Sequence, residues 1–214
     1  RGDAALDDLD LNPILVQAER DIEAGSPHDR DREAVPDTLD ALMVRDADTA
    51  LQFGSKMQLS YNVENTQRAI GTRLSSHIVR KFGMTGLREN HISVRLRGTA
   101  GQSLGAFATQ GLRLEVIGDA NDYVGKGLSG GTIIVRPSAA AAFVAHENTI
   151  IGNTVLYGAT SGKLFAAGQA GERLCVRNSG ATAVVEGAGT NACEYMTGGR
   201  VVILGEVGDN FGAG

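Results

Sequence analysis

The segment that most resembles a ligand-binding motif is GKGLSG at residues 125–130. It has the G-x-G-x-x-G spacing of a dinucleotide-binding turn, in which a helix N-terminus receives the pyrophosphate. Such a turn must follow a buried strand and begin a helix, but here the polar DANDY at 119–123 precedes the motif and the strand-like TIIV at 132–135 follows it. The phosphate-loop pattern also fails, because no Ser or Thr follows Lys126. We therefore predict that these glycines form corners of the chain and bind no nucleotide.

The remaining side chains with a potential for chemistry are scattered along the sequence. Glu115, Asp119 and Asp122 form a local acidic group, but Asx turns at a corner explain the aspartates better than a calcium loop, which needs glycine-flanked repeats. The four histidines lack a second histidine or a carboxylate at a metal-ligand spacing. These histidines are His28, His77, His91 and His146. We therefore predict no catalytic, cofactor-binding or metal-ligating residues in this chain.

Charge and cysteine content exclude several classes of function. The formal net charge is −5, so no basic field invites nucleic acid. Cys175 and Cys193 lack a C-x-x-C partner and are expected to be small core residues of a protein in a reducing compartment. Neither a secretory leader nor an apolar stretch of about 18 residues is present, so we expect a soluble, cytoplasmic protein that binds no membrane.

Residues 92–214 have a repeating pattern, in which glycines separate short β-branched runs. Any side chain with a potential for chemistry in this region must be positioned by that repeat. Glycine occupies 23 of these 123 residues but only 6 of the preceding 91. The clearest runs begin at steps of 20, 20, 22, 19 and 27 residues, with an extra run at Thr182 inside the last step. They start at Ile92, Leu112, Thr132, Thr154, Arg173 and Arg200. Runs at this interval stack into a solenoid, so we predict a mainly β fold, a right-handed single-stranded parallel β-helix of about six or seven coils.

The middle apolar residue of each run is expected to point into the core. This predicts an interior that contains Val116, Ile134, Val155, Val176, Val184 and Val202. The sequence ends at Gly214 in the middle of a repeat, which indicates a β-helix truncated at its C-terminus. An uncovered strand edge at 200–204 (RVVIL) then predicts self-association of the chain.

The first 91 residues have a different organisation. Residues 1–40 contain 12 Asp or Glu and 4 Arg, so residues 1–36 are expected to form an acidic arm or linker without a core of its own. Residues 37–91 predict a helix–strand–helix cap on the N-terminal end of the β-helix, which occupies 92–214. The expected helices are 37–54 and a second one that begins after Asn65 or Thr66 and stops at Gly83, with a strand over 56–63 between them.

Several segments together resemble one family. YNVENTQRAIGTRLSSHIVRKFGMTG (61–86), GDANDYVGKGLSGG (118–131) and IIGNTVLYGATSGKLFAAGQAGERLCVRN (150–178) look like the C-terminal domain of the large (alpha) chain of glutamate synthase. The resemblance covers about residues 36–214, and Leu174 stands where the family pattern has Phe.

This resemblance implies a structural role within a larger enzyme. In the family, an N-terminal glutaminase with a Cys nucleophile releases ammonia from glutamine. A barrel that carries FMN and an iron–sulfur cluster then uses this ammonia to convert 2-oxoglutarate to glutamate, with electrons from NADPH through a small (beta) subunit or from ferredoxin. None of those groups matches a residue of this chain. The implied function is a non-catalytic domain without a cofactor, which braces the glutaminase and FMN domains and has them and the beta subunit as partners.

Two other classes of function stay open. One is a stand-alone β-helix assembly subunit like that of formylmethanofuran dehydrogenases. The other is a β-helical sugar hydrolase or transferase, which would need paired carboxylates at a groove. Glu115 with Asp119 and Asp122 is the only local acidic group for that chemistry, since Glu186 and Glu194 are isolated in the sequence.

Overall fold

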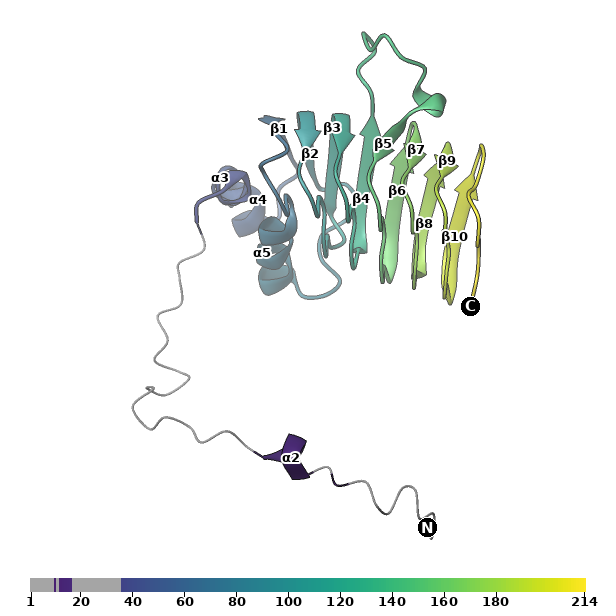
Figure 1. Ribbon diagram of the computed structural model, residues 1–214. Coiled ribbons are helices and arrows are strands. Elements are labelled where there is room, and N and C mark those ends of the chain that lie inside the picture. The colour runs from purple at the N-terminus through teal and green to yellow at the C-terminus, as the bar shows by residue number, and fades with distance from the viewer. Residues whose placement is uncertain (1–9, 11, 17–35) are drawn as a thin grey trace. The chain divides into compact units, whose positions relative to one another are not determined.

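A computed structural model describes residues 10, 12–16 and 36–214 (Figure 1). The chain divides into two units, Arg1–Pro36 and Asp37–Gly214. Within the described residues of the first unit, Asn12–Leu15 form the short helix α2. The arm expected for residues 1–36 therefore lies almost entirely outside the described residues, and the described strands all belong to the second unit.

Ten strands of the second unit form one sheet, and every strand pairing in it is parallel. The main row runs in the order β1, β2, β3, β4, β6, β8 and β10, visible as successive arrows in Figure 1. Its bounds are β1 Met57–Val63, β2 Ile92–Ala100, β3 Leu112–Ala120, β4 Ser129–Arg136, β6 Ser161–Ala166, β8 Ser179–Val185 and β10 Gly198–Ile203. Successive coils stack strand on strand, which confirms the predicted parallel β-helix.

A second, shorter row of strands closes another side of the coils. It consists of β5 (Thr149–Ile151), β7 (Gln169–Ala170) and β9 (Gly187–Ala188), in that order, and it joins the main row where Ala120 pairs with Ile151. The one-turn 3-10 helix η1 (Ala145–Glu147) precedes β5. The long excursion between β4 and β5 projects from one side of the stacked coils, at the top of the view in Figure 1.

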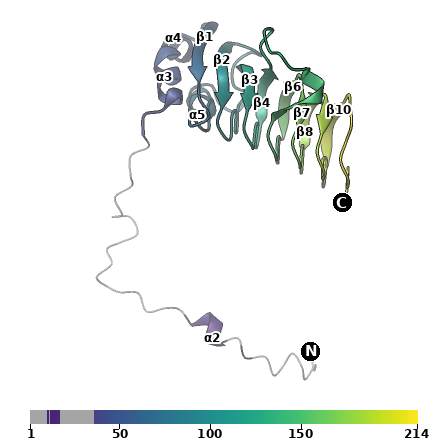
Figure 2. The same cartoon turned by 45° about the horizontal axis from the view of Figure 1, so that its top comes forward.

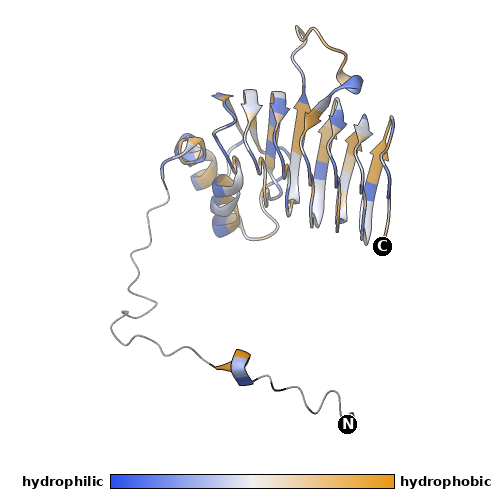
Figure 3. Cartoon of the chain, viewed as in Figure 1, coloured by the Kyte–Doolittle hydropathy of each residue, from blue (hydrophilic) through white to orange (hydrophobic). Residues whose placement is uncertain are grey.

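The core lies inside the coils, where alternate side chains of each strand meet those of its neighbours. Leu114 and Val116 of β3 pair in register with Ile133 and Val135 of β4, and all four are fully buried. Hydrophobic segments recur from strand to strand across the sheet (Figure 3). Because β-branched side chains pack well on a pleated surface, the pattern favours strands here over helices.

The predicted interior is correct for three of the six named residues and wrong for the other three. Val116, Val155 and Val176 are buried as expected. Ile134 and Val184 are only half-buried, and Val202 is 46% exposed, because the flanking residues of the same strands take the inward positions. Runs such as TIIV are apolar on both faces, so alternation alone does not fix which side chains point inward.

A third ladder of backbone hydrogen bonds connects the coils, and it is not made of strands. In each coil three alternate residues have φ between +52° and +102°. The segments are 103–107, 123–127, 154–158, 173–177, 191–195 and 210–214. Gly125 N–H donates to the Leu104 carbonyl of the preceding coil at 2.8 Å, whereas Gly127 N–H donates to the Tyr157 carbonyl of the following coil at 2.8 Å. We call these six segments the turn ladder; the tilted view of Figure 2 shows the coils that it connects.

Two of the predicted runs belong to the turn ladder. TVLYG at 154–158 and RLCVR at 173–177 have positive φ at every second residue, which excludes a β-strand. The run at Thr182, interpreted from the sequence as an extra, is instead a regular rung, since Thr182 pairs with Lys163 on one side and Arg200 on the other. The long step falls between Thr132 and Lys163, where the excursion between β4 and β5 is inserted.

The helices differ from the prediction at their bounds. The expected helix 37–54 is two helices, α3 (Leu39–Asp46) and α4 (Asp48–Phe53), separated at Ala47, and it ends at Gly54 as predicted. Helix α5 (Thr72–Phe82) begins after Gly71 rather than after Asn65 or Thr66, because the intervening residues form a turn with Ala69 and Gly71 at positive φ. Strand β1 pairs with β2 along its whole length, so it is a rung of the main row.

Asp40 of α3 holds the start of α5. The residue at the N-cap of α5 is Gly71, which has no side chain to accept the first N–H groups. The buried Asp40 carboxylate takes this role, with Oδ1 accepting from Gly71 N–H at 3.1 Å and Oδ2 from Arg73 N–H at 2.6 Å. Burial raises the pKa of Asp40, although these hydrogen bonds and the charge of Arg73 oppose the shift.

Candidate functional site

The outer face of β2, β3 and β4 carries a compact group of charged side chains. Since Leu114 and Val116 point inward, the intervening Glu115 of β3 points outward. The parallel register places Arg95 of β2 directly opposite Glu115. Arg113, two residues before Glu115 on β3, lies on the same face.

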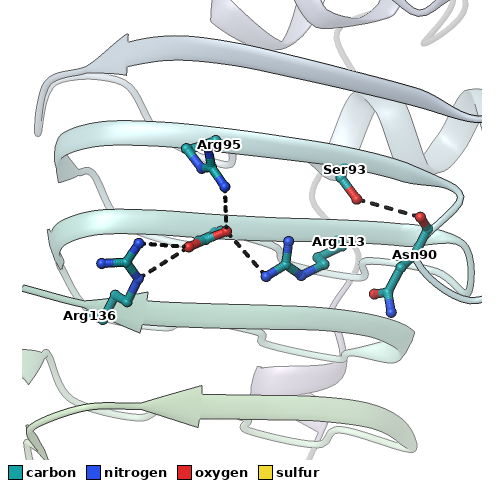
Figure 4. A network of polar contacts seen from close by, with 6 residues as sticks. Asn90, Ser93, Arg95, Arg113 and Arg136 are labelled. Atoms are coloured by element: carbon teal, nitrogen blue, oxygen red, sulfur yellow. Dashed lines mark hydrogen bonds and ion pairs between the residues drawn. The ribbon is translucent and has the colours of Figure 1, made fainter.

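Glu115 accepts contacts from three arginines on three neighbouring strands (Figure 4). Arg136 of β4 reaches Oε1 with both Nε and Nη2 at 3.1 Å. Arg113 Nη2 lies 3.1 Å from Oε2, and Arg95 Nη2 lies 3.6 Å from the same oxygen. The Glu115 side chain is 8% exposed, whereas those of Arg95 and Arg136 are 51% and 41% exposed. The carboxylate is thus buried beneath guanidinium groups that reach solvent.

The arginines determine the protonation of Glu115. Burial alone would raise the pKa of this carboxyl. The hydrogen bond from Arg136 and the charges of Arg113, Arg95 and Arg136 outweigh that penalty and lower the pKa below its usual value. Glu115 is therefore ionised at neutral pH, and it is an ion-pair partner rather than a general acid.

A depression of about 260 Å³ opens beside this cluster. Its floor is formed by the outer faces of β1, β2 and β3, where Ser60 lies opposite Arg95 and Gln58 lies opposite Ser93. Leu59, Val94, Arg113 and Glu115 complete the lining. The hydroxyl of Ser93 makes a long contact, 3.5 Å, to the Asn90 carbonyl, also drawn in Figure 4. The depression therefore has a mixed lining, in which two arginines stand beside neutral polar and apolar residues.

The same outer face changes character farther along the sheet. The position of Glu115 is occupied by Ile134 on β4, Phe165 on β6, Val184 on β8 and Val202 on β10, all in register. Phe165 is 39% exposed and Val202 is 46% exposed. One column of outward side chains is therefore charged on β2 and β3 and apolar from β4 to β10.

The glycines of GKGLSG lie in the turn ladder and at the start of β4. Gly125 and Gly127 have φ of +64° and +62°, and Ser129 begins the strand, so the motif leads into a strand as predicted. A Cβ on Gly125 would lie 2.7 Å from Leu156, and one on Gly127 would lie 2.5 Å from the ring of Phe107. These glycines serve backbone conformation and close packing between coils.

The other candidates from the sequence occupy separate places. His77 lies on α5, the ring of His91 contacts the Gly54 carbonyl and His146 lies in η1, while His28 falls outside the described residues. Over residues 10, 12–16 and 36–214, there is no group of three or more His, Cys, Asp or Glu that could hold a metal ion.

Asp122 and Glu194, two of the acidic candidates, are engaged in structural contacts. Asp122 accepts from the backbone N–H of Asn153 in the next coil at 2.8 Å. Asn121 accepts from Asp122 N–H at 2.7 Å, as expected for a polar side chain at a corner. Glu194 accepts from the side-chain amide of Asn191 at 2.6 Å.

The two cysteines are buried free thiols at equivalent positions of adjacent coils in the turn ladder. Burial raises the pKa of both thiols, and for Cys175 the neighbouring Cys193 adds to the shift. Both are core residues, as predicted.

Sequence reasoning missed the arginine cluster, although part of its signal was present. A step of 20 residues places Arg95 opposite Glu115, so the observed coil length alone predicts that pair. Arg136 pairs in register with Ile117, and it reaches Glu115 diagonally through its long side chain. That contact needs the geometry of the sheet as well as the spacing.

Comparison with known proteins gives a consistent result. A family model described as GXGXG motif matches residues 40–214. The large chain of the NADPH-dependent glutamate synthase of Azospirillum brasilense is 68% identical over 205 residues, which cover 96% of this chain and 14% of that protein. The Bacillus subtilis large chain is 46% identical over 96% of this chain and 13% of its own length. A ferredoxin-dependent glutamate synthase of Synechocystis is 51% identical over 82% of this chain and 11% of its own length.

The chain therefore spans only a small part of the relatives that it matches. Among the described residues, no helix is long and apolar enough to cross a membrane. A cytoplasmic location stays a prediction.

Proposed function

From the premise that this chain belongs to the GXGXG motif family and to the C-terminal part of glutamate synthase large chains, we propose that it is a non-catalytic structural domain. In the complete enzyme it braces a glutaminase domain and an FMN-containing synthase domain, which together convert glutamine, 2-oxoglutarate and reductant to glutamate. The names of the relatives support this assignment over a stand-alone subunit of the formylmethanofuran dehydrogenase kind.

The proposal rests on the backbone hydrogen bonds that connect each coil to the next. Each coil is tied to the next by the main row, and the later coils also by the short row of β5, β7 and β9 and throughout by the turn ladder. Bonds on several sides of a solenoid resist bending in more than one direction. A tunnel that passes ammonia between two active sites tolerates little misalignment, so a stiff support between them benefits the reaction.

We propose that the cofactors of the complete enzyme are held outside this chain. The chain has two cysteines, both buried in the core, and an iron–sulfur cluster held by cysteines alone takes more thiolate ligands than this. The glycines of GKGLSG are packed against neighbouring coils and lead into a strand, so they do not present a helix N-terminus to a phosphate. FMN, the cluster and the NADPH-binding beta subunit would therefore contact other parts of the enzyme.

The experiment compares two single substitutions in a complete glutamate synthase that contains this domain. Gly118→Val disrupts the contact between β2 and β3, whereas Gly158→Ala lies in open space and is the control. We expect the first variant to hydrolyse glutamine while releasing ammonia that is not converted to glutamate, and the control to stay coupled. Full coupling in a variant whose β-helix is shown by proteolysis to be loosened would contradict the bracing role.

A second measurement uses the chain alone. We expect no turnover of glutamine, 2-oxoglutarate or a glycoside by residues 1–214. Saturable turnover of any of these substrates would show that the chain carries an active site and would overturn its assignment as a non-catalytic domain.

A further inference from the structure

The arginines around Glu115 outnumber the carboxylate that they surround. Among the described residues, three guanidinium groups share one carboxylate, so the cluster keeps an excess of positive charge. Arg95 is the least engaged of the three, because its 3.6 Å contact is too long for a direct hydrogen bond. About half of its side chain is exposed. A guanidinium carries five N–H donors in a planar fork, and within residues 10, 12–16 and 36–214 no hydrogen bond occupies those of Arg95.

The surplus charge faces the depression on β1, β2 and β3. Arg95 and Arg113 both line it, and their Nη2 atoms both approach the same oxygen of Glu115, at 3.6 and 3.1 Å. The two groups are therefore close enough for one oxyanion to contact both. Arg136 does not line the depression, and it offsets the charge of Glu115 from the side of β4. A net positive charge therefore remains at Arg95 and Arg113 for a ligand, although Arg113 is also paired with Glu115.

We propose that this depression binds an oxyanion, a carboxylate or a phosphate, through Arg95 and Arg113. Forked guanidinium donors match both groups and form short, charge-assisted hydrogen bonds to them. Gln58 and Ser60 of β1 line the same depression and supply neutral donors. A water occupies about 30 Å³ of liquid, so a space of about 260 Å³ holds an oxyanion group with a few further atoms. Glu115 is a positioning residue, because it fixes Arg113.

The oxyanion has two sources, a free small molecule or an acidic side chain of another domain. The second source rests on the proposed function, since it requires the longer polypeptide. Both sources use the same chemistry at Arg95 and Arg113.

The test titrates the chain of residues 1–214 with inorganic phosphate and with succinate at low ionic strength, followed by calorimetry and by amide chemical shifts of β1 to β3. We expect saturable binding in the millimolar range. Arg95→Gln should weaken it by about tenfold, and Arg95→Lys should weaken it less, because charge is kept while the fork is lost. The control is Arg200→Gln, on the outer face at the far end of the main row, and it should leave the affinity within about twofold.

Thermal melting of each variant separates loss of the site from loss of the fold. Arg95 makes one long contact, so Arg95→Gln should melt close to the parent chain. An absence of saturable binding by the parent chain would overturn the proposal. Equal binding by the parent chain and a folded Arg95→Gln variant would overturn it as well.

A second arm distinguishes the sources by repeating the phosphate titration on a complete enzyme. Binding that persists indicates a site for a free ligand, and binding that is lost only in the complete enzyme indicates that an acidic side chain of another domain fills it. This readout is independent of coupling between glutamine hydrolysis and glutamate formation, so failure of the site and failure of the bracing role are told apart.

Discussion

The main row of strands and the turn ladder solve the same problem with opposite backbone conformations. Both stack one coil on the next by parallel hydrogen bonds, and both place buried residues such as Leu164 of β6 and Leu174 of the turn ladder in one core. In the strands, alternation of side chains across an extended backbone separates inside from outside. In the turn ladder, positive φ at every second residue turns successive N–H groups to the preceding and the following coil.

This difference shows that a stacked hydrogen bond can stabilise conformations that side chains disfavour. Most positive-φ positions of the turn ladder are not glycine, and they include Leu156, Arg173 and Tyr195. Each such residue costs on the order of 1 kcal/mol. The ladder bonds and the buried side chains of the same segments offset that cost. Glycine is required only where a neighbouring coil also leaves no space for a Cβ, as at Gly125.

The largest expected effect comes from breaking the main row at Gly118. A Cβ there would lie 2.0 Å from the Gly98 carbonyl oxygen, and φ is +146°. We expect Gly118→Ala to lower the free energy of unfolding by at least about 4 kcal/mol, because the backbone of two strands must separate. Gly158→Ala in the turn ladder has φ of +62° with nothing within 4 Å, so it should lose only about 1 kcal/mol. Urea unfolding of both variants measures the difference, and similar losses would show that steric contact between strands is not what Gly118 avoids.

The next effect tests whether the main row and the turn ladder share one core. Leu164 and Leu174 are both fully buried, one on each ladder. We expect Leu164→Ala and Leu174→Ala each to cost about 3 kcal/mol by the lost burial and the cavity left behind. Urea unfolding measures both losses. If Leu174→Ala cost less than about 1 kcal/mol, the turn ladder would contribute little to the core, and the main row and the turn ladder would not share one core.

The two ladders also differ in how far the sequence predicts them. Short β-branched runs at a step near 20 residues indicate stacked strands, and Ile92, Leu112 and Thr132 fall on them as predicted. Nothing in TVLYG or RLCVR marks positive φ, since Leu156 and Cys175 hold conformations that their side chains do not favour. These segments have apolar residues at strand-like spacing, so they are easily read as rungs. Their conformation is a property of the stack and is not encoded locally.

The candidate site shows the same limit at the level of side chains. The coil length predicts the pair of Arg95 and Glu115, because both occupy the same place in successive coils. Ile134 lies one coil farther in the same column, and only the pairing of TIIV with β3 shows that it points outward. Arg136 reaches Glu115 across the register, which depends on the length of the side chain. The spacing of the repeats therefore predicts which residues are neighbours along a column. It does not predict which residues of an apolar run point outward, or which long side chains make diagonal contacts, and these come from the structure.

A smaller effect sharpens the contrast between the charged and apolar parts of the outer face. We expect Glu115→Gln to cost about 2 kcal/mol near pH 7, because three arginines lose the carboxylate that separates them and their exposure moderates the loss. The folded-state pKa of Glu115 is lowered, so its contribution is present above the pKa of the unfolded chain and is lost as pH falls through the folded-state value. The difference between parent and variant should therefore shrink below about pH 4. Thermal melts from pH 7 to pH 3 measure it, and Val184→Ala on the apolar part of the same face provides a pH-independent comparison.

The smallest expected effect is the change in stability when arginine is replaced by glycine, and it has opposite signs in the turn ladder and in the main row. Arg173 and Arg200 are both exposed, but Arg173 has φ of +62° in the turn ladder whereas Arg200 lies in β10. Arg173→Gly relieves the positive-φ strain and should stabilise the chain by about 0.5 kcal/mol, after the greater entropy of glycine in the unfolded state is subtracted. Arg200→Gly gains nothing of this kind and should destabilise the chain by about 0.5–1 kcal/mol. The midpoint of denaturant unfolding of each variant, compared with that of the parent chain, gives the sign of its stability change. This comparison holds when the slopes of the free energy against denaturant concentration agree. Destabilisation of similar size at both sites would mean that the stack has removed the conformational cost of a side chain at positive φ, and that glycine and arginine are equally suited to the turn ladder.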